Sequence, residues 1–111
     1  MGKSRDNLIP GTLNALILKA LSTGSSHGYA ISRWIHAASE SVLRVDEGVM
    51  YPALHRLERD GMVESKWGRN DTGHRAKFYS LTRQGRQQLE TEIDRWSRSS
   101  NAVWAVLDAD S

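Results

Sequence analysis

Residues 46–61 read DEGVMYPALHRLERDG, and they carry the most informative pattern for predicting the fold. Asp46 can cap a helix, because its side chain accepts a hydrogen bond from the free backbone amides of a first helical turn. Gly61 can end that helix in the left-handed conformation, so we predict a helix over residues 47–60 with Pro52 near its start. One stripe of this helix is apolar and should face a core, namely Met50, Leu54 and Leu57.

The residues before this helix predict two further helices. A turn at residues 10–11 leads to Thr12 as a cap, and apolar residues then recur at helical spacing, namely Leu13, Leu16, Ile17, Ala20 and Leu21. Gly24 ends this helix. The serine pair at residues 25–26 can cap the next one, whose apolar stripe is Ala30, Ile31, Trp34, Ile35 and Ala38.

After Gly61 the apolar residues no longer recur at helical spacing. Residues 62–67 and 76–81 are rich in Val, Trp, Phe and Tyr, and the residues between them are turn formers with two glycines, which predicts a β-hairpin. Thr82 can then cap one helix over residues 83–107, ~37 Å long at 1.5 Å per residue. A helix longer than a small domain is wide cannot be covered by its own chain.

This order of elements predicts a mostly helical α+β fold, a winged helix-turn-helix. We expect the winged unit at residues 8–81 and the long C-terminal helix at residues 82–108, within one compact unit. The chain has 111 residues, which supports one domain, and it has no cysteine, which excludes disulfides and Cys-ligated zinc. The N-terminus is polar and no stretch approaches the ~18 apolar residues of a membrane span, so we expect a cytoplasmic protein without membrane contact.

The charge is unevenly distributed along the chain. The net charge is only +2, yet residues 1–86 carry 13 basic and 8 acidic side chains, whereas residues 87–111 carry 2 basic and 5 acidic ones. A basic portion beside an acidic segment indicates a surface for a polyanion next to a segment with a different role.

The face of the 47–60 helix opposite its apolar stripe suits nucleic acid. Arginine can form two hydrogen bonds to guanine, and a tyrosine hydroxyl can donate to phosphate. The alternative is a solvated face whose arginines pair with Glu58 or Asp60. Three basic residues of the hairpin, which we expect to point the same way, favour double-stranded DNA as the partner: Lys66, Arg75 and Lys77. The helix face itself presents Gly48, Val49, Tyr51, Pro52, His55, Arg56 and Arg59.

Four blocks of the sequence resemble the PadR family of bacterial transcriptional regulators. They read LIPGTL at 8–13, HGYAI at 27–31, GVMYPALHRLE at 48–58 and KFYSLTRQG at 77–85, and the likeness covers roughly residues 8–107. The resemblance implies a homodimeric repressor that binds a palindromic operator and releases it on meeting an effector. It also implies that the chain belongs to the family's short subgroup, whose members have a single C-terminal dimerisation helix. Residues 8–81 would then be the DNA-binding domain and residues 82–108 the dimerisation helix.

The resemblance further implies roles for individual residues. Residues 47–59 become the recognition helix, which enters the major groove by its first turns, so that Glu47 joins the DNA-facing set. His27 and Tyr29 would contact backbone phosphate, whereas Arg75 and Lys77 would grip a phosphate or the minor groove. Val49 departs from the family pattern, because relatives often have a small hydroxyl residue there. It cannot donate to phosphate but could meet a thymine methyl group.

The terminal helix carries a heptad seam that predicts a homodimer. The seam residues step by four and three, with Ser100 as the polar interruption and Trp104 widening the stripe: Leu89, Ile93, Trp96, Val103 and Leu107. Trp96 has two interpretations. It packs as a large seam residue, or it stacks on a planar aromatic small-molecule effector, as an aromatic residue near this place does in multidrug-sensing relatives.

No arrangement in the sequence predicts catalysis, a cofactor or a metal. The four histidines are scattered, and the pair His36 and Glu40, spaced i and i+4, offers two ligands where a closed zinc site needs four. The competing function is a winged-helix module that binds proteins and does not read DNA. It shares the fold and the seam, and it differs only in what the basic face contacts.

Overall fold

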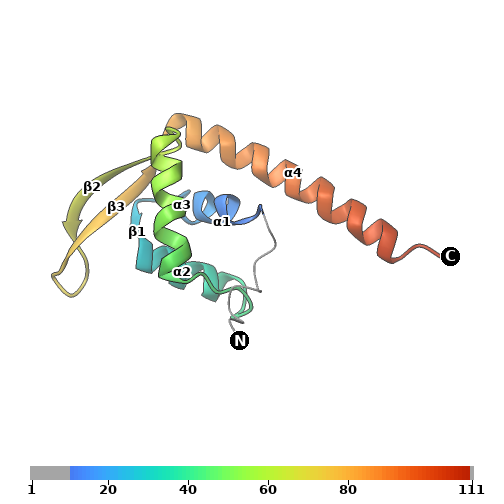
Figure 1. Cartoon of the computed structure of the whole chain (residues 1–111), viewed down its shortest axis with the longest axis horizontal. Coiled ribbons are helices and arrows are strands. Elements are labelled where there is room, and N and C mark those ends of the chain that lie inside the picture. The colour runs from blue at the N-terminus through green and yellow to red at the C-terminus, as the bar shows by residue number, and fades with distance from the viewer. Residues whose placement is uncertain (1–10, 111) are drawn as a thin grey trace.

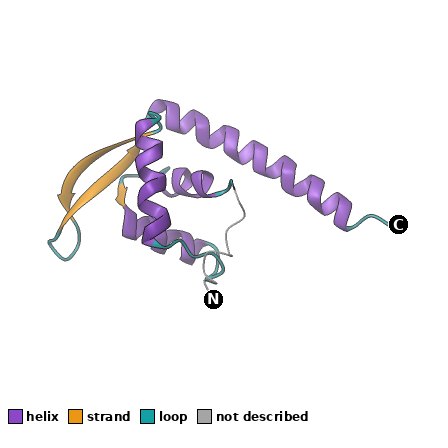
Figure 2. Cartoon of the chain, in the orientation of Figure 1, coloured by secondary structure: helices purple, strands orange, loops and turns teal. Residues whose placement is uncertain are grey.

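The computed structural model describes residues 11–110, and it confirms a mostly helical α+β fold (Figure 1). The chain runs through α1 (Leu13–Ala20), β1 (Ser26–His27), α2 (Gly28–Ala38) and α3 (Glu47–Arg59), then β2 (Val63–Arg69), β3 (Arg75–Leu81) and α4 (Arg83–Leu107). The strands form one antiparallel sheet in the order β1-β3-β2. The β2–β3 hairpin, residues 63–81, projects to one side of the three short helices and is called the wing below (Figure 2).

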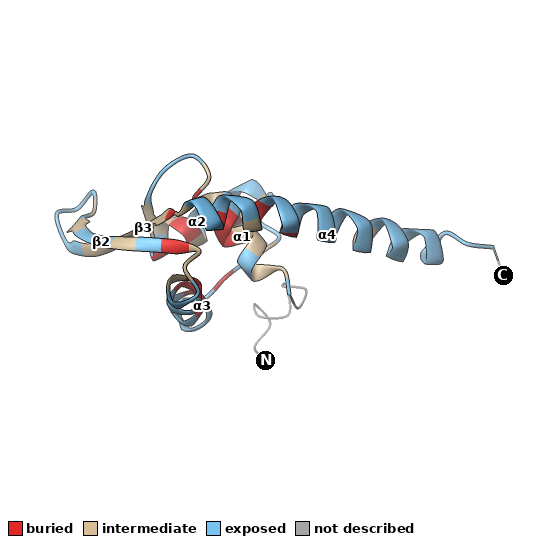
Figure 3. Ribbon diagram, turned by 90° about the horizontal axis from the view of Figure 1, so that it is seen from above, coloured by how far each residue is buried: buried red, intermediate tan, exposed pale blue. Residues whose placement is uncertain are grey.

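The core lies where α1, α2 and α3 meet the base of the sheet. Its fully buried members come from all three helices and β2, namely Ile17, Leu18, Leu21, Ile31, Ile35, Met50, Leu54 and Val63. The first turns of α4 close this core, because Leu89 is buried within it. Residues 11–92 therefore form one packed body, called the head, and Figure 3 shows that burial ends there while α4 continues outward.

A tight corner joins the end of α3, both wing strands and the start of α4. Thr82 caps α4 as predicted, since its Oγ1 accepts from the Gly85 amide at 3.0 Å, and the same hydroxyl donates to the Gly61 carbonyl at 2.6 Å. Gly61 has φ +80°, the left-handed value predicted for the end of α3. A Cβ on Gly85 would overlap the Met62 carbonyl oxygen, so only glycine lets α4 start this close to β2.

The structure corrects the predicted start of α2. The cap is His27, not the serine pair, because His27 Nδ1 accepts from the Ala30 amide at 3.3 Å. Residues 26–27 instead pair with β3 as a strand too short to leave an alternating pattern. The α1 and α3 caps are confirmed only in position: Thr12 and Asp46 stand at the N-caps without a side-chain capping bond. The predicted turn at residue 10 lies outside the described residues.

Three smaller expectations also differ. The helix α1 ends at Ala20, before Gly24, and the α2 stripe is narrower than predicted because Trp34 and Ala38 are not buried. The pair His36 and Glu40 is not on one helix, since α2 ends at Ala38 and Glu40 has φ +56°. His36 Nδ1 instead donates to the Leu43 carbonyl at 3.0 Å, which ties the α2–α3 link to α2. Among the described helices, none is long and apolar enough to cross a membrane.

Candidate nucleic-acid interface

The outer face of α3 is open to solvent along its whole length. The predicted periodicity is confirmed, because the stripe of Met50, Leu54 and Leu57 is buried together with Ala53. Arg59 Nε lies 3.5 Å from Asp60 Oδ1, but both side chains are more than half exposed, so this pair is weak. All eight predicted DNA-facing residues of α3 are exposed: Glu47, Gly48, Val49, Tyr51, Pro52, His55, Arg56 and Arg59.

The first turn of α2 packs beside α3. A Cβ on Gly28 would lie 2.8–3.0 Å from the Tyr51 ring, so this glycine lets the ring rest directly on the α2 backbone. The rings of His27 and Phe78 form a T-shaped pair with centroids 5.2 Å apart, while His27 Nδ1 caps α2. Tyr29 is exposed in the first turn of α2, with the Arg33 guanidinium 5.7 Å from its ring centroid. His27, Tyr29 and Tyr51 are thereby brought to the same end of the head.

The wing carries its basic residues on two different faces, which corrects the expectation that they point together. Lys77 pairs with Trp67 across the strands, and Arg75 pairs with Arg69, so these four side chains share one face. Lys66 pairs with Phe78 and lies on the other face. Arg69 is the residue that sequence reasoning missed, because it was assigned to the turn, whereas β2 continues through Gly68 to Arg69.

Trp67 organises the basic face of the wing. The Arg75 guanidinium lies 4.5 Å from the centroid of the Trp67 ring and Lys77 Nζ lies 6.0 Å from it, so an exposed indole holds two cations close to its ring. At the tip, Asn70 Oδ1 accepts from Thr72 N, Thr72 Oγ1 and His74 N at 2.9–3.1 Å. The tip is therefore closed by its own hydrogen bonds.

Glu58 joins the wing to α3. Ser65 Oγ on β2 donates to Glu58 Oε2 at 2.7 Å, and Lys77 Nζ on β3 lies 3.6 Å from Glu58 Oε1. Burial raises the pKa of Tyr79 beside this pair, and the charge of Glu58 and the neighbouring Tyr51 raise that pKa further. These contacts make α3 and the basic face of the wing one continuous surface, although Glu58 compensates part of the Lys77 charge.

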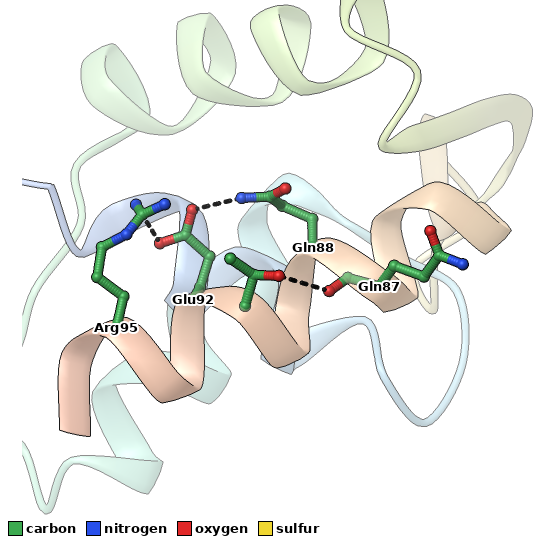
Figure 4. A network of polar contacts seen from close by, with 5 residues as sticks. Gln87, Gln88, Glu92 and Arg95 are labelled. Carbon is green, nitrogen blue, oxygen red and sulfur yellow. Dashed lines mark hydrogen bonds and ion pairs between the residues drawn. The ribbon is translucent and has the colours of Figure 1, made fainter. Parts of the chain in front are cut away.

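The burial of the terminal helix α4 changes at Glu92: apolar residues before it are buried and those after it are exposed. Leu89 is 8% exposed and packs in the core of its own head, so it is not part of the exposed stripe that the heptad pattern predicted for it. The other predicted seam residues are exposed, namely Ile93, Trp96, Val103, Trp104 and Leu107. Val106, which the heptad pattern does not include, is exposed as well. Glu92 is buried between these regions, where it accepts from Gln88 Nε2 at 2.9 Å and pairs with Arg95 Nη1 at 3.4 Å (Figure 4).

A groove of about 480 Å³ lies between α1 and α4. Its wall on α1 is apolar, with Ala15 and Leu16, and its wall on α4 includes Trp96 and Val103 beside the polar network of Glu92 and Arg95. Trp96 and Val103 thus belong both to the exposed stripe of α4 and to the groove.

Comparison with known proteins identifies relatives of this arrangement. Residues 17–91 match the model of the transcriptional regulator PadR-like family. A PadR-like transcriptional regulator from Bacillus cereus superposes with a TM-score of 0.75 at 28% identity, covering 90% of this chain and 95% of that one. A transcriptional regulator from Clostridium thermocellum gives 0.76 at 27% identity, covering 84% and 90%.

Relatives found by sequence differ in how much of their own length this chain covers. An uncharacterised protein of Lysinibacillus sphaericus is 27% identical over 89% of this chain and 91% of its own length. The transcriptional regulator YqjI of Escherichia coli is 34% identical over 72% of this chain, which corresponds to 37% of its own length. The chain thus spans nearly all of the first relative and little more than a third of the second.

Proposed function

The chain belongs to the PadR-like family of transcriptional regulators, and we propose that it acts as a homodimeric repressor that binds an inverted-repeat operator. The observation that supports this proposal most directly is the continuous exposed surface made by α3 and the wing, in which Glu58 holds the two together. As a DNA-binding regulator, the chain needs such a surface to contact base edges and phosphates at once.

In this proposal α3 enters the major groove by its first turns. Arg56 reads guanine, Val49 contacts a thymine methyl group, and Glu47 accepts from a cytosine amino group. The remaining exposed residues of this face position the helix or lie against base edges and phosphates: Gly48, Tyr51, Pro52, His55 and Arg59. His27 and Tyr29, at the start of α2, contact a phosphate, helped by the positive end of the α2 dipole.

The wing contacts the neighbouring backbone through the face that carries Trp67. Arg69 and Arg75 are the cations at its outer end, and Lys77 contributes from beside Glu58. Lys66 is left out of this contact set, because the register places it on the opposite face of the wing.

The outer part of α4, residues 93–107, supplies the proposed dimer contact. It exposes large apolar side chains on a helix that the head does not cover, and pairing with a second copy would bury them. A two-fold dimer fits an inverted repeat whose half-sites lie about one helical turn apart, ~10 bp centre to centre. Such a repressor would act in the cytoplasm.

We propose a planar aromatic effector at Trp96. The groove between α1 and α4 places this indole beside the stripe proposed to form the dimer, so a ligand stacked there would alter the packing of the two copies. Addition of a planar cationic dye such as ethidium to the DNA-free protein should quench tryptophan fluorescence. Trp96→Ala should abolish the quenching, whereas Trp34→Ala, which removes an indole of nearly equal exposure (44% against 43%), should retain it.

The decisive experiment is selection of bound fragments from bacterial genomic DNA, followed by fluorescence anisotropy on the selected duplex over a salt series. A dimer that makes about 6–10 phosphate contacts should lose ~10³–10⁵ in affinity between 50 and 200 mM salt. Arg56→Ala should relax the base preference, whereas Arg75→Ala should weaken all sequences alike. A shallow salt dependence on every duplex would contradict DNA binding and favour a winged-helix module that binds protein.

A further inference from the structure

A second basic cluster borders the surface described above, beside Tyr29. A hollow of about 390 Å³ separates α2 from the segment that leads into α3. Two arginines flank it, Arg33 from the middle of α2 and Arg44 from the segment before α3. The described residues that line the hollow include no carboxylate, namely Ser32, Arg33, His36, Ala37, Arg44 and Val45.

Contacts place the Arg33 side chain and the backbone on either side of Arg44, and no described residue compensates the charge of either arginine. Arg33 rests on the ring of Tyr29, and Arg44 follows Leu43, whose carbonyl accepts from His36, and precedes the buried Val45. Within residues 11–110, neither guanidinium lies within 4.0 Å of a carboxylate oxygen. In the same part of the chain, Ser32 Oγ is a buried hydroxyl without a hydrogen-bond partner. The hollow therefore has positive charge and one buried hydroxyl that the described residues do not use.

The hollow lies at the opposite end of α3 from the wing contact. Arg44 precedes the first residue of α3 by three positions, whereas Glu58, which holds the wing, is the last residue but one (Figure 1). A helix of 13 residues is ~20 Å long, and the major groove is ~12 Å wide. Groups at the two ends of α3 are therefore far enough apart to reach the two sugar–phosphate backbones that border one major groove.

We propose that Arg33 and Arg44 bind a backbone phosphate of the operator on the side of α3 away from the wing. The wing and this cluster, called the Arg33/Arg44 site, then contact the two strands that border one major groove. The inference rests on the proposed DNA binding and extends it to residues that neither the periodicity of α3 nor the hairpin indicates.

The test is the double variant Arg33→Gln/Arg44→Gln in the full chain, compared with Lys19→Gln/Arg86→Gln. The control removes two exposed charges, from α1 and from the start of α4, that do not line the hollow. Anisotropy on the selected duplex and on a scrambled duplex should show a similar weakening on both, about tenfold or more. The salt slope should fall by ~0.9 for each phosphate that the variant no longer neutralises, whereas the control should keep the slope of the wild type.

Two further measurements keep the outcomes distinct. Arg33→Lys/Arg44→Lys retains the charges and should recover most of the salt slope, and thermal unfolding by circular dichroism should show that all three variants fold. A steep salt slope in the wild type that is unchanged in Arg33→Gln/Arg44→Gln would overturn the Arg33/Arg44 site while leaving the proposed function intact. A shallow slope in the wild type itself would overturn the proposed function.

A free phosphate group could use the same chemistry. The melting temperature is measured without DNA in inorganic phosphate and in chloride at equal ionic strength. It should be the same in both salts, for the wild type and for Arg33→Gln/Arg44→Gln. Stabilisation of the wild type alone, combined with an unchanged DNA salt slope in the variant, would assign the hollow to a small phosphorylated ligand and overturn its assignment to DNA.

Discussion

The two halves of α4 carry the same apolar stripe and differ in what covers it. Leu89 is 8% exposed because it packs within the core of the head, whereas Leu107, about five turns further along the same helix, is 65% exposed. The head is thus complete within one chain. The outer part of α4 has apolar surface but no partner among residues 11–110 to bury it.

A heptad pattern alone therefore does not distinguish residues that stabilise the folded chain from residues that join two chains. A buried leucine of the head should contribute to the free energy of unfolding at any protein concentration. An apolar residue of the outer part of α4 should contribute only when a second copy binds, so its effect should depend on concentration.

The largest effect is expected at the corner where α4 leaves the head. Gly85→Ala places a methyl group on the Met62 carbonyl, and because backbone cannot rotate away, we expect a decrease of roughly 2–3 kcal/mol in the free energy of unfolding. That corresponds to a melting temperature lower by about 10–20 °C. Gly48→Ala is the matched control, because nothing lies within 4 Å of its added Cβ. It should stabilise the helix by up to ~1 kcal/mol, and equal melting temperatures for the two variants would contradict this account.

The division within α4 is tested by one substitution made at two sites. Leu89→Ala should lower the free energy of unfolding by about 2–3 kcal/mol, because it opens a cavity in the head, and this decrease should be the same at low and high protein concentration. Leu107→Ala should leave the head unchanged and raise the dimer dissociation constant about tenfold or more. Urea unfolding and analytical ultracentrifugation separate the two results. A concentration-independent destabilisation by Leu107→Ala would mean that the outer part of α4 packs on its own head.

Most of the fold was predictable, because interactions between residues close in sequence mark the ends of its helices and strands. Gly61 and Thr82 signal the end of α3 and the start of α4 through a left-handed φ and a side-chain cap, and the structure confirms both. The start of α2 was not predictable in this way, because the imidazole of His27 accepts the capping bond at a position where a preceding serine is the more usual choice. The strand β1 has only two residues, which is too few for alternation to appear.

The site was predictable only where one element defines it. The periodicity of α3 correctly separates its exposed face from its buried one. The expectation that Lys66 shares a face with Arg75 and Lys77 is wrong, because the face of a strand residue depends on a register that the hairpin sets. The expectation that Leu89 lies on the uncovered stripe of the terminal helix is wrong, because the packing of the head covers it. The hollow between Arg33 and Arg44 is made by residues eleven positions apart on a helix and a link, so no local pattern indicates it.

A smaller effect is expected where α3 holds the wing. Glu58→Ala removes the acceptor of Ser65 and the partner of Lys77, and because both charged side chains are about one-third exposed, we expect a decrease of only about 1 kcal/mol in the free energy of unfolding. Glu58→Gln keeps an acceptor for Ser65 and should cost less than half of that. Glu64→Ala, on the opposite face of β2, is the control and should be neutral. Urea unfolding measures all three, and equal decreases for Ala and Gln would show that the charge, not the hydrogen bond to Ser65, carries the contact.

The smallest effect is expected at Tyr79, and it appears only in alkaline solution. Burial first, and then the charge of Glu58 and the neighbouring Tyr51, raise the pKa of Tyr79 above its usual value of 10.0. The unfolded chain therefore releases this proton first as the pH rises, so the stability that the neutral phenol contributes is complete below pH 10 and is lost above it. Thermal melting at successive pH values should show Tyr79→Phe losing less stability above pH 10 than the wild type. Tyr29→Phe, an exposed site, should behave as the wild type. If Tyr79→Phe instead followed the wild-type curve, the alkaline transition would belong to groups outside the contact between α3 and the wing.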